Sequence, residues 1–159
     1  IGIQVADCTA VLIYGKRKSG EEFVAAIHAG WRGTAKNIFE AFYTEVQPQE
    51  WTAWLSPRIC QNHFEVGPEV LEKLGESSKT FAKPGEKDRH YLDLGALQKV
   101  QLEALGAKVI VHPLCTYHQP EFFSYRRSAS LETGRHFAYI SLGADPRHEV
   151  QGQLVNELA

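Results

Sequence analysis

The fold is decided by the stretch Asp7-Cys8-Thr9-Ala10-Val11-Leu12-Ile13-Tyr14 and by its continuation after a polar turn, Phe23-Val24-Ala25-Ala26-Ile27-His28. Short apolar runs separated by glycine-containing turns predict two strands, and the short turn over residues 15–20 predicts that they form an antiparallel hairpin. If the turn centres on Lys18, partner residue numbers sum to about 36. Cys8 then lies opposite His28 with Cβ atoms about 5 Å apart.

Further elements on the C-terminal side of the hairpin predict an α/β protein. Thr34 is expected to cap a helix that runs to Val46, and Asp93 a second helix that ends before Gly106. Strands are expected at residues 51–55, 109–111 and 137–142 and an extended segment at 122–127, with a short helix at 68–74 and a loop over 76–89. The sequence therefore predicts a single-domain α/β sandwich with a mixed sheet.

Composition narrows the class of function. The chain has 159 residues, of which 43% are hydrophobic, and its formal net charge of -2 gives no global attraction to nucleic acid or anionic membranes. Three widely spaced cysteines do not make a disulfide framework, which favours a cytoplasmic protein with free thiols or metal ligands. Because the chain contains no methionine and opens on a strand-like run, we expect the fold to be incomplete at the N-terminus.

The predicted pairing of Cys8 with His28 gives the candidate site. A thiol and an imidazole on one face suit either two ligands of a zinc ion or a thiolate activated by a base, although both residue types also occur as structural residues at strand ends. Asp7 points to the other face of an ideal strand, where it orients a loop or caps Thr34.

Arginines supply candidate anion contacts. Gly30-Trp31-Arg32-Gly33-Thr34 lies where a strand enters a helix, which favours an anion site at Arg32 or an ordinary glycine-rich turn. Arg126 and Arg127 are adjacent, so in an extended segment only one of them reaches a given pocket.

Two weaker signals concern the remaining cysteines. Cys60 and His63 have the i, i+3 spacing of a metal pair if that segment is helical, but two ligands without a matching second pair do not define a site. Cys115 follows a buried strand and is expected to be structural.

Five segments together resemble one known family in order and spacing. They are Ala6-Asp7-Cys8-Thr9-Ala10-Val11-Leu12, Ala25-Ala26-Ile27-His28-Ala29-Gly30-Trp31-Arg32-Gly33-Thr34, Phe64-Glu65-Val66-Gly67, Cys115-Thr116-Tyr117, and Phe122-Phe123-Ser124-Tyr125-Arg126-Arg127 with Thr133-Gly134-Arg135. The family is that of laccase-domain or multicopper polyphenol oxidase proteins, whose members are also described as purine nucleoside phosphorylases. The resemblance assigns residues 1–143 to such a domain and leaves 144–159 as a tail of unknown role.

The resemblance implies a zinc-dependent purine nucleoside phosphorylase that also deaminates adenosine, with adenosine, inosine or methylthioadenosine as substrates. It implies that Cys8 and His28 are metal ligands and that a third ligand belongs to a Gln-Val-His motif upstream of the present chain. Phosphate would be held by Arg32 with Arg126 or Arg127, and Asp7 is the candidate proton shuttle. Cys60 departs from the family's usual glycine at this position.

Three alternatives stay open. A copper-dependent polyphenol oxidase is less favoured, because a multicopper site needs more clustered histidines than Cys8 and His28 provide. A metal-free Cys/His hydrolase needs a Cys8 thiolate and an oxyanion hole. An inactive binding module is the third. No feature of the sequence predicts assembly beyond a monomer or weak homo-oligomer.

Overall fold

The computed structural model describes residues 1–129 and 133–143, so the tail expected at 144–159 lies outside the described residues. The main sheet has the order β3-β2-β4-β8, in which β2 is antiparallel to both neighbours and β4 is parallel to β8. Its strands are β2 (Thr9–Arg17), β3 (Glu22–Ala29), β4 (Pro48–Leu55) and β8 (Lys108–Val111). The predicted mixed sheet is therefore confirmed.

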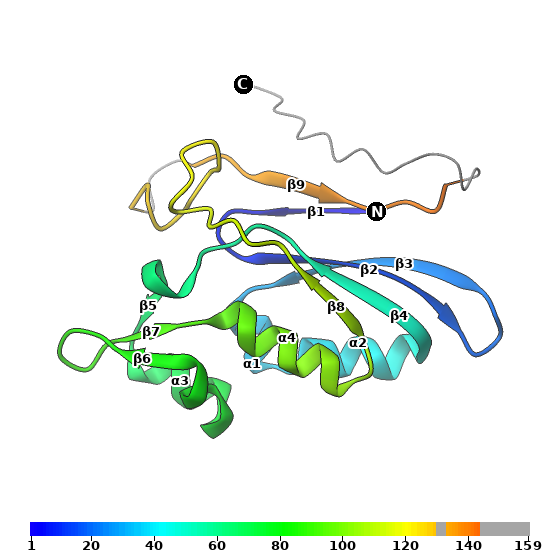
Figure 1. Cartoon of the computed structure of the whole chain (residues 1–159), viewed down its shortest axis with the longest axis horizontal. Coiled ribbons are helices and arrows are strands. Elements are labelled where there is room, and N and C mark those ends of the chain that lie inside the picture. The colour runs from blue at the N-terminus through cyan, green and yellow to red at the C-terminus, as the bar shows by residue number, and fades with distance from the viewer. Residues whose placement is uncertain (130–132, 144–159) are drawn as a thin grey trace.

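Helices cover one face of this sheet and a two-stranded ribbon lies on the other (Figure 1). The helices are α1 (Trp31–Ala35), α2 (Ile38–Val46) and α4 (Leu94–Ala104), and the ribbon pairs β1 (Gly2–Val5) with β9 (His136–Tyr139). The two ends of the described chain thus meet in one antiparallel pair. The predicted α/β sandwich is confirmed.

The core lies between the sheet and the helices. Odd-numbered residues of the strands point to this side, as shown by Val11, Ile13, Ala53 and Leu55, which are fully buried together with Phe39 of α2. Because side chains alternate along a strand, the even-numbered residues face the ribbon side. His28 belongs to this second set and is exposed.

The expected register of the hairpin is wrong by two residues. Ala10 pairs with His28 and Thr9 with Ala29, so partner numbers sum to 38 and Cys8 lies beyond the last pair. The turn consists of residues 18–20, because the Arg17 amide still donates to the Glu21 carbonyl at 2.9 Å. Within this turn, Gly20 takes a φ of 86°. Glycine occupies this left-handed position without strain, which shifts the centre of the turn to Ser19.

The expected helix from Thr34 to Val46 is divided in two. Thr34 lies inside α1, and Asn37 takes a φ of 56° before α2 begins at Ile38. Thr34 is therefore no helix cap, because its hydroxyl donates back to the Gly30 carbonyl at 3.0 Å. The expected cap at Asp93 is confirmed, since its carboxylate accepts a hydrogen bond from the Ala96 amide at 2.9 Å.

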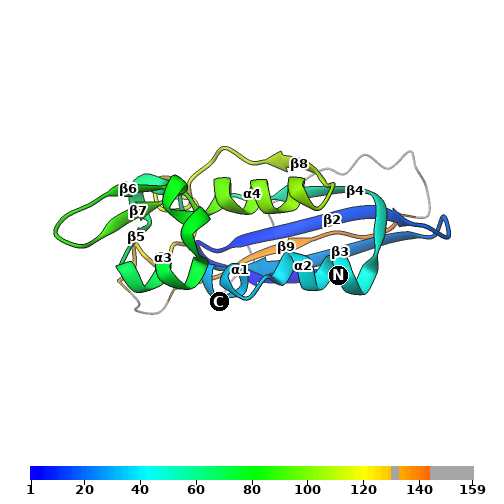
Figure 2. The same cartoon turned by 90° about the horizontal axis from the view of Figure 1, so that it is seen from below.

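A small second sheet occupies one end of the molecule (Figure 2). It has the order β5-β7-β6, and its strand β6 together with the 3-10 helix η2 lies within residues 76–89, where a loop was expected. Its strands are β5 (Glu65–Val66), β6 (Ala82–Pro84) and β7 (His90–Leu92). The helices of this part of the chain are the 3-10 helix η1 (Gln61–His63), α3 (Pro68–Leu74) and the 3-10 helix η2 (Glu76–Phe81). The extended segment expected over 122–127 is not formed, because the chain makes bends and turns there.

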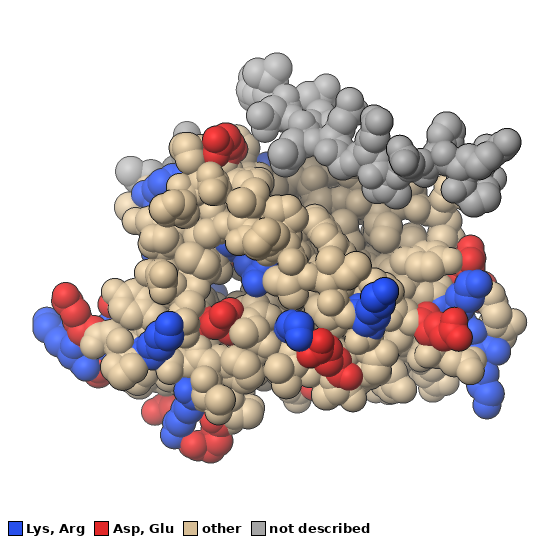
Figure 3. Space-filling view, viewed as in Figure 1, with Lys and Arg blue, Asp and Glu red and all other residues tan. Residues whose placement is uncertain are grey.

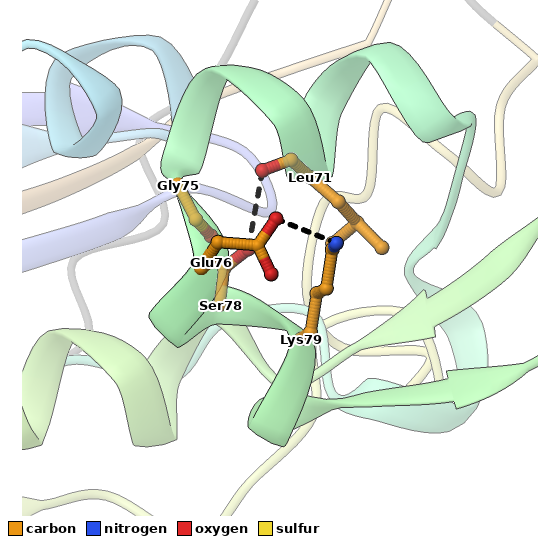
Figure 4. A network of polar contacts seen from close by, with 5 residues as sticks. All are labelled: Leu71, Gly75, Glu76, Ser78 and Lys79. Atoms are coloured by element: carbon orange, nitrogen blue, oxygen red, sulfur yellow. Dashed lines mark hydrogen bonds and ion pairs between the residues drawn. The ribbon is translucent and has the colours of Figure 1, made fainter.

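Helix α3 is joined to η2 by the buried hydroxyl of Ser78 (Figure 4). This hydroxyl donates to the carbonyls of Gly75 at 2.7 Å and Leu71 at 3.2 Å. An exposed ion pair between Lys79 and Glu76, with 2.7 Å between Nζ and Oε1, lies beside it. The hydroxyl is a second donor to both carbonyls, because Leu71 also accepts from the Gly75 amide and Gly75 from the Ser78 amide, each at 3.0 Å.

Charges of both signs are interspersed over the helical side of the face in Figure 3. This distribution gives no field of a single sign on that face. No helix among the described residues is both long and apolar enough to cross a membrane.

A buried polar network ties the two hairpin strands to the helices. The Gln98 amide of α4 accepts from the Thr9 hydroxyl at 2.7 Å and donates to the Ala29 carbonyl at 2.6 Å and the Thr34 hydroxyl at 3.0 Å. Gln98 is fully buried and both threonines are about 1% exposed. A satisfied network of this kind fixes the start of β2 against the end of β3.

We predict that Gln98→Leu lowers the free energy of unfolding by about 2–4 kcal/mol, because it leaves buried polar partners without hydrogen bonds. Urea denaturation followed by circular dichroism measures the change. The matched control is Gln101→Leu in the same helix, where the amide oxygen has no hydrogen-bond partner among the described residues. Equal effects of the two substitutions would contradict the assigned role of the network.

Candidate metal and anion site

The Asp7 carboxylate organises the turn that carries Cys8. It is about 9% exposed and accepts hydrogen bonds from the Thr116 hydroxyl at 2.6 Å, the Ser124 hydroxyl at 3.0 Å and the Arg126 amide at 2.7 Å. Asp7 takes a φ of 76°, a left-handed conformation that aspartate tolerates better than most residues. The predicted loop-orienting role is confirmed, whereas the expected cap of Thr34 is not formed.

The backbone of Asp7 extends the same connection to a third segment. Its carbonyl accepts from the Ile59 amide at 3.0 Å, and the Ser56 hydroxyl accepts from the Ala10 amide at 2.9 Å. Three segments that are distant in sequence, around residues 56–60, 116 and 124–126, therefore meet at the start of β2. This convergence sets the direction in which Cys8 leaves the strand.

Cys8 lies above Gly30 at the open end of the hairpin. A Cβ added at Gly30 would stand 3.0 Å from the Cys8 Sγ, so the absence of a side chain there makes room for the sulfur. The Gly30 backbone is extended, with φ -78° and ψ 170°. A Cβ at position 30 would therefore point to the same face of the sheet as the side chain of His28. The Cys8 sulfur thus lies on the face that carries His28, displaced along the strand by two residue pairs.

The donor set and the space fit a soft divalent metal. A partly exposed thiol and an exposed imidazole are the two side-chain types that zinc binds most often, and Gly30 leaves the sulfur open. Residues of these types could supply two of the ligands that a zinc site requires.

Two arginines act on the Cys8 sulfur. Burial raises the pKa of the Cys8 thiol and the Asp7 carboxylate raises it further, while the guanidinium groups of Arg135 and Arg32 act in the opposite direction. Arg32 was predicted as an anion contact, but Arg135 was not. The only sequence signal for Arg135 is its place after Thr133-Gly134, because nothing in the sequence brings residues 8 and 135 together before β1 pairs with β9.

The structure gives the adjacent pair Arg126 and Arg127 different surroundings. Arg127 donates to the carbonyls of Thr116, Tyr117 and Gln119 at 2.7–3.2 Å and also to that of Phe122. Arg126 donates to the Glu65 carbonyl at 2.9 Å and lies over the Phe64 ring at 5.6 Å. Arg127 therefore braces a loop through carbonyl groups, and Arg126 retains more of its guanidinium for a ligand.

A second group of soft ligands stands on the loops held by Asp7. The Nδ1 of His63 lies 3.3 Å from the Cys60 Sγ and 3.6 Å from the Cys115 Sγ, and all three ligand atoms lie within 4.8 Å of one another. Such a group can hold a metal ion. The i, i+3 pair noted in the sequence is thus completed by Cys115, which follows β8.

The protonation of these residues is shaped by their surroundings. Burial raises the pKa of Cys60, and Cys115 raises it further. Burial alone would raise the pKa of Cys115, but hydrogen bonds from Cys60 and from the backbone amides of His118 and Tyr117 outweigh burial and lower it. Burial and the nearby His118 lower the pKa of His63. The two thiols therefore differ, with Cys115 the more readily ionised.

A large apolar groove lies elsewhere on the described chain. A groove of about 630 Å³ lies between β9 and the ribbon-side face of β2 and β4, lined by aromatic and aliphatic groups such as Trp54 and Tyr139. Cys8, His28 and Arg32 do not line it. The groove is therefore separate from the polar site.

Comparisons with known proteins agree with this architecture. A model of the family described as multi-copper polyphenol oxidoreductase laccase matches residues 1–143. A purine nucleoside phosphorylase of Bacteroides thetaiotaomicron is 34% identical over 147 residues, covering 84% of this chain and 53% of the relative. An adenosine deaminase, RL5, of an unknown prokaryotic organism is 31% identical over 153 residues, covering 88% and 57%.

A crystal structure of the Neisseria meningitidis protein NMB0706 superposes with a TM-score of 0.75 at 31% identity, over 86% of this chain and 57% of that chain. The chain spans somewhat more than half the length of the curated relatives it matches. Because the family match covers nearly all described residues, the chain belongs to the multi-copper polyphenol oxidoreductase laccase family.

Proposed function

We propose that this chain carries the site of a purine nucleoside phosphorylase that also deaminates adenosine. The observation that carries the proposal is the position of the Cys8 thiol, which lies on the His28 face above Gly30 and is acted on by Arg32 and Arg135. Soft metal ligands beside two cations suit a substrate that combines a nucleoside with phosphate. The names of the relatives support this choice.

We propose zinc as the metal, with Cys8 and His28 as two of its ligands. When bound, zinc would supply a Lewis acid that lowers the pKa of a water molecule for attack on C6 of adenosine. Copper is less favoured, because one thiol and one imidazole do not make a multicopper site. The three free thiols also fit a reducing compartment, and we place the protein in the cytoplasm.

In phosphorolysis, a phosphate oxygen forms a bond to C1′ of the ribose while the bond from C1′ to the purine nitrogen breaks. The electron pair of that bond leaves with the base, which takes up a proton. Arg32 and Arg135, with Arg126, would hold the phosphate by charge-assisted hydrogen bonds. The Asp7 carboxylate already accepts three hydrogen bonds from the protein, so we assign it the positioning of Cys8 rather than proton transfer.

The first test is substrate turnover by the metal-loaded chain. We expect inosine to release hypoxanthine only when inorganic phosphate is present, and adenosine to yield inosine and ammonia without phosphate, as measured by chromatography. Cys8→Ser and His28→Gln should each lower kcat/KM on the order of 100-fold or more through loss of a metal ligand. His90→Gln, in β7, is the matched control and should keep full activity.

The remaining results of this test would identify the rival functions. Oxygen uptake with a phenol by copper-loaded protein would identify the chain as an oxidase rather than a phosphorylase. Ester or amide cleavage by metal-free protein, abolished by alkylation of Cys8, would identify a hydrolase. If the zinc-loaded chain binds nucleoside without turning it over, the result would identify the chain as a binding module.

The second test concerns the arginines. We predict that Arg32→Gln and Arg135→Gln each raise the KM for phosphate about 10-fold, the loss expected for one charge-assisted hydrogen bond, and leave the KM for nucleoside nearly unchanged. Steady-state kinetics with varied phosphate measures this. Lys36→Gln, a neighbouring cation that does not act on Cys8, is the control. Equal effects on both KM values would argue against phosphate at these residues.

The third test uses the space above Gly30. We expect Gly30→Ala to displace the Cys8 sulfur, because the new methyl group would stand 3.0 Å from it, and so to weaken zinc binding at Cys8. Gly33→Ala, three residues further on in α1, adds a methyl group 3.4 Å from Ile38 and is the matched control. Zinc titration against a chromophoric chelator compares the two variants. Unchanged zinc affinity in Gly30→Ala would refute the close approach of Cys8 to this backbone.

A further inference from the structure

Three soft ligand atoms converge at the end of the main sheet, outside the site assigned to the nucleoside. Cys60 follows β4, His63 lies in η1 and Cys115 follows β8, so the group depends on contacts between distant segments. A tetrahedral zinc ion bound at about 2.3 Å from sulfur and about 2.0 Å from nitrogen keeps neighbouring ligand atoms about 3.5–3.8 Å apart. The two observed sulfur-to-nitrogen distances, 3.3 and 3.6 Å, agree closely with this spacing.

Groups around the three ligands hold them in orientation. The Cys60 amide donates to the Cys115 Sγ at 3.2 Å, and the amides of Tyr117 and His118 also hydrogen bond to this sulfur. The Tyr117 ring stacks on the His63 ring with 4.2 Å between centroids and an interplanar angle of 20°. Amide donors to a thiolate and a fixed imidazole plane are the outer contacts that metal sites use.

The group is accessible on one side. Cys115 is buried, whereas Cys60 and His63 are partly exposed, so an ion can enter from solvent and keep one coordination position for water. The position of His63 also distinguishes a metal site from a simple pair of thiols. A disulfide between Cys60 and Cys115 would leave no role for an imidazole nitrogen that faces both sulfurs.

We propose that Cys60, His63 and Cys115 bind Zn²⁺, or a cation of the same thiophilic class, as a second metal centre separate from Cys8 and His28. This ion joins the segment after β4 to the segment after β8, which otherwise meet at an isolated bridge between Arg58 and Cys115. The centre would hold two loops together, because its ligands lie on the segments that follow β4 and β8.

The centre is connected to the nucleoside site through Asp7. Ile59, next to Cys60, donates its amide to the Asp7 carbonyl, and Thr116, next to Cys115, donates its hydroxyl to the Asp7 carboxylate at 2.6 Å. Binding of the ion therefore fixes both partners of the residue that precedes Cys8. Loss of the ion should loosen the Cys8 turn without removing any ligand from it.

The test uses the full chain with Cys8→Ser, which removes the sulfur of the first site. Reduced, metal-free protein is titrated with Co²⁺, and we expect one equivalent to give an intense thiolate-to-cobalt charge-transfer band. Adding Cys60→Ser, Cys115→Ser or His63→Gln should weaken Co²⁺ binding by about 100-fold or more, beyond the loss that an outer-contact substitution causes. His118→Gln, which changes a neighbouring ring but no ligand, is the matched control.

A second measurement does not depend on how the cluster variants fold. In the Cys8→Ser chain, one equivalent of Zn²⁺ should slow alkylation of Cys60 and Cys115 by iodoacetamide at least 10-fold, as read by peptide mass spectrometry. Absence of both the charge-transfer band and this protection would overturn the proposal. A Cys60–Cys115 disulfide that persists in the reduced protein would do the same. Neither result bears on nucleoside turnover, which is measured with Cys8 intact.

Discussion

The buried carboxylate of Asp7 is the interaction on which the site depends. A charge this far from water is tolerated only when it is fully hydrogen bonded, and Asp7 meets the condition with two hydroxyl donors and one amide donor. Its donors come from segments more than 100 residues away in sequence. The turn that aims Cys8 is consequently formed only when the last third of the described chain has folded onto the first strand.

The opposite side of the sheet has its own polar anchor. Gln98 holds the first residue of β2 and the last residue of β3 from the helical side, one position away from Cys8 and from Gly30. The end of the hairpin is therefore fixed from both faces by satisfied polar groups rather than by apolar packing alone. Such groups specify a single arrangement, since any displacement leaves a buried donor or acceptor unpaired.

Local patterns in the sequence were sufficient to predict most helices and strands, but not the strand register or the contacts between distant segments. The strand pattern and the Asp93 cap predicted the sheet and α4 because both depend on neighbours in sequence. The hairpin register failed because one glycine, Gly20, moves the turn centre by a single residue and each partner by two. Arg135 and the Cys115 partner of His63 were missed because their contacts span more than 50 residues, and no local periodicity encodes such contacts.

The two cysteine sites differ in the groups that stabilise a thiolate, and this difference bears on their roles. Arg32 and Arg135 are side-chain cations whose charges act to lower the pKa of Cys8. Cys115 is instead surrounded by backbone amides, whose donors are fixed by the loop itself and have no other acceptor to serve. Side-chain cations suit a site that binds an anionic substrate, whereas backbone amides fixed by a loop suit an ion that joins two loops. Cysteine thiols thereby serve two roles in the proposals, with Cys8 at the substrate site and Cys115 at the second metal centre.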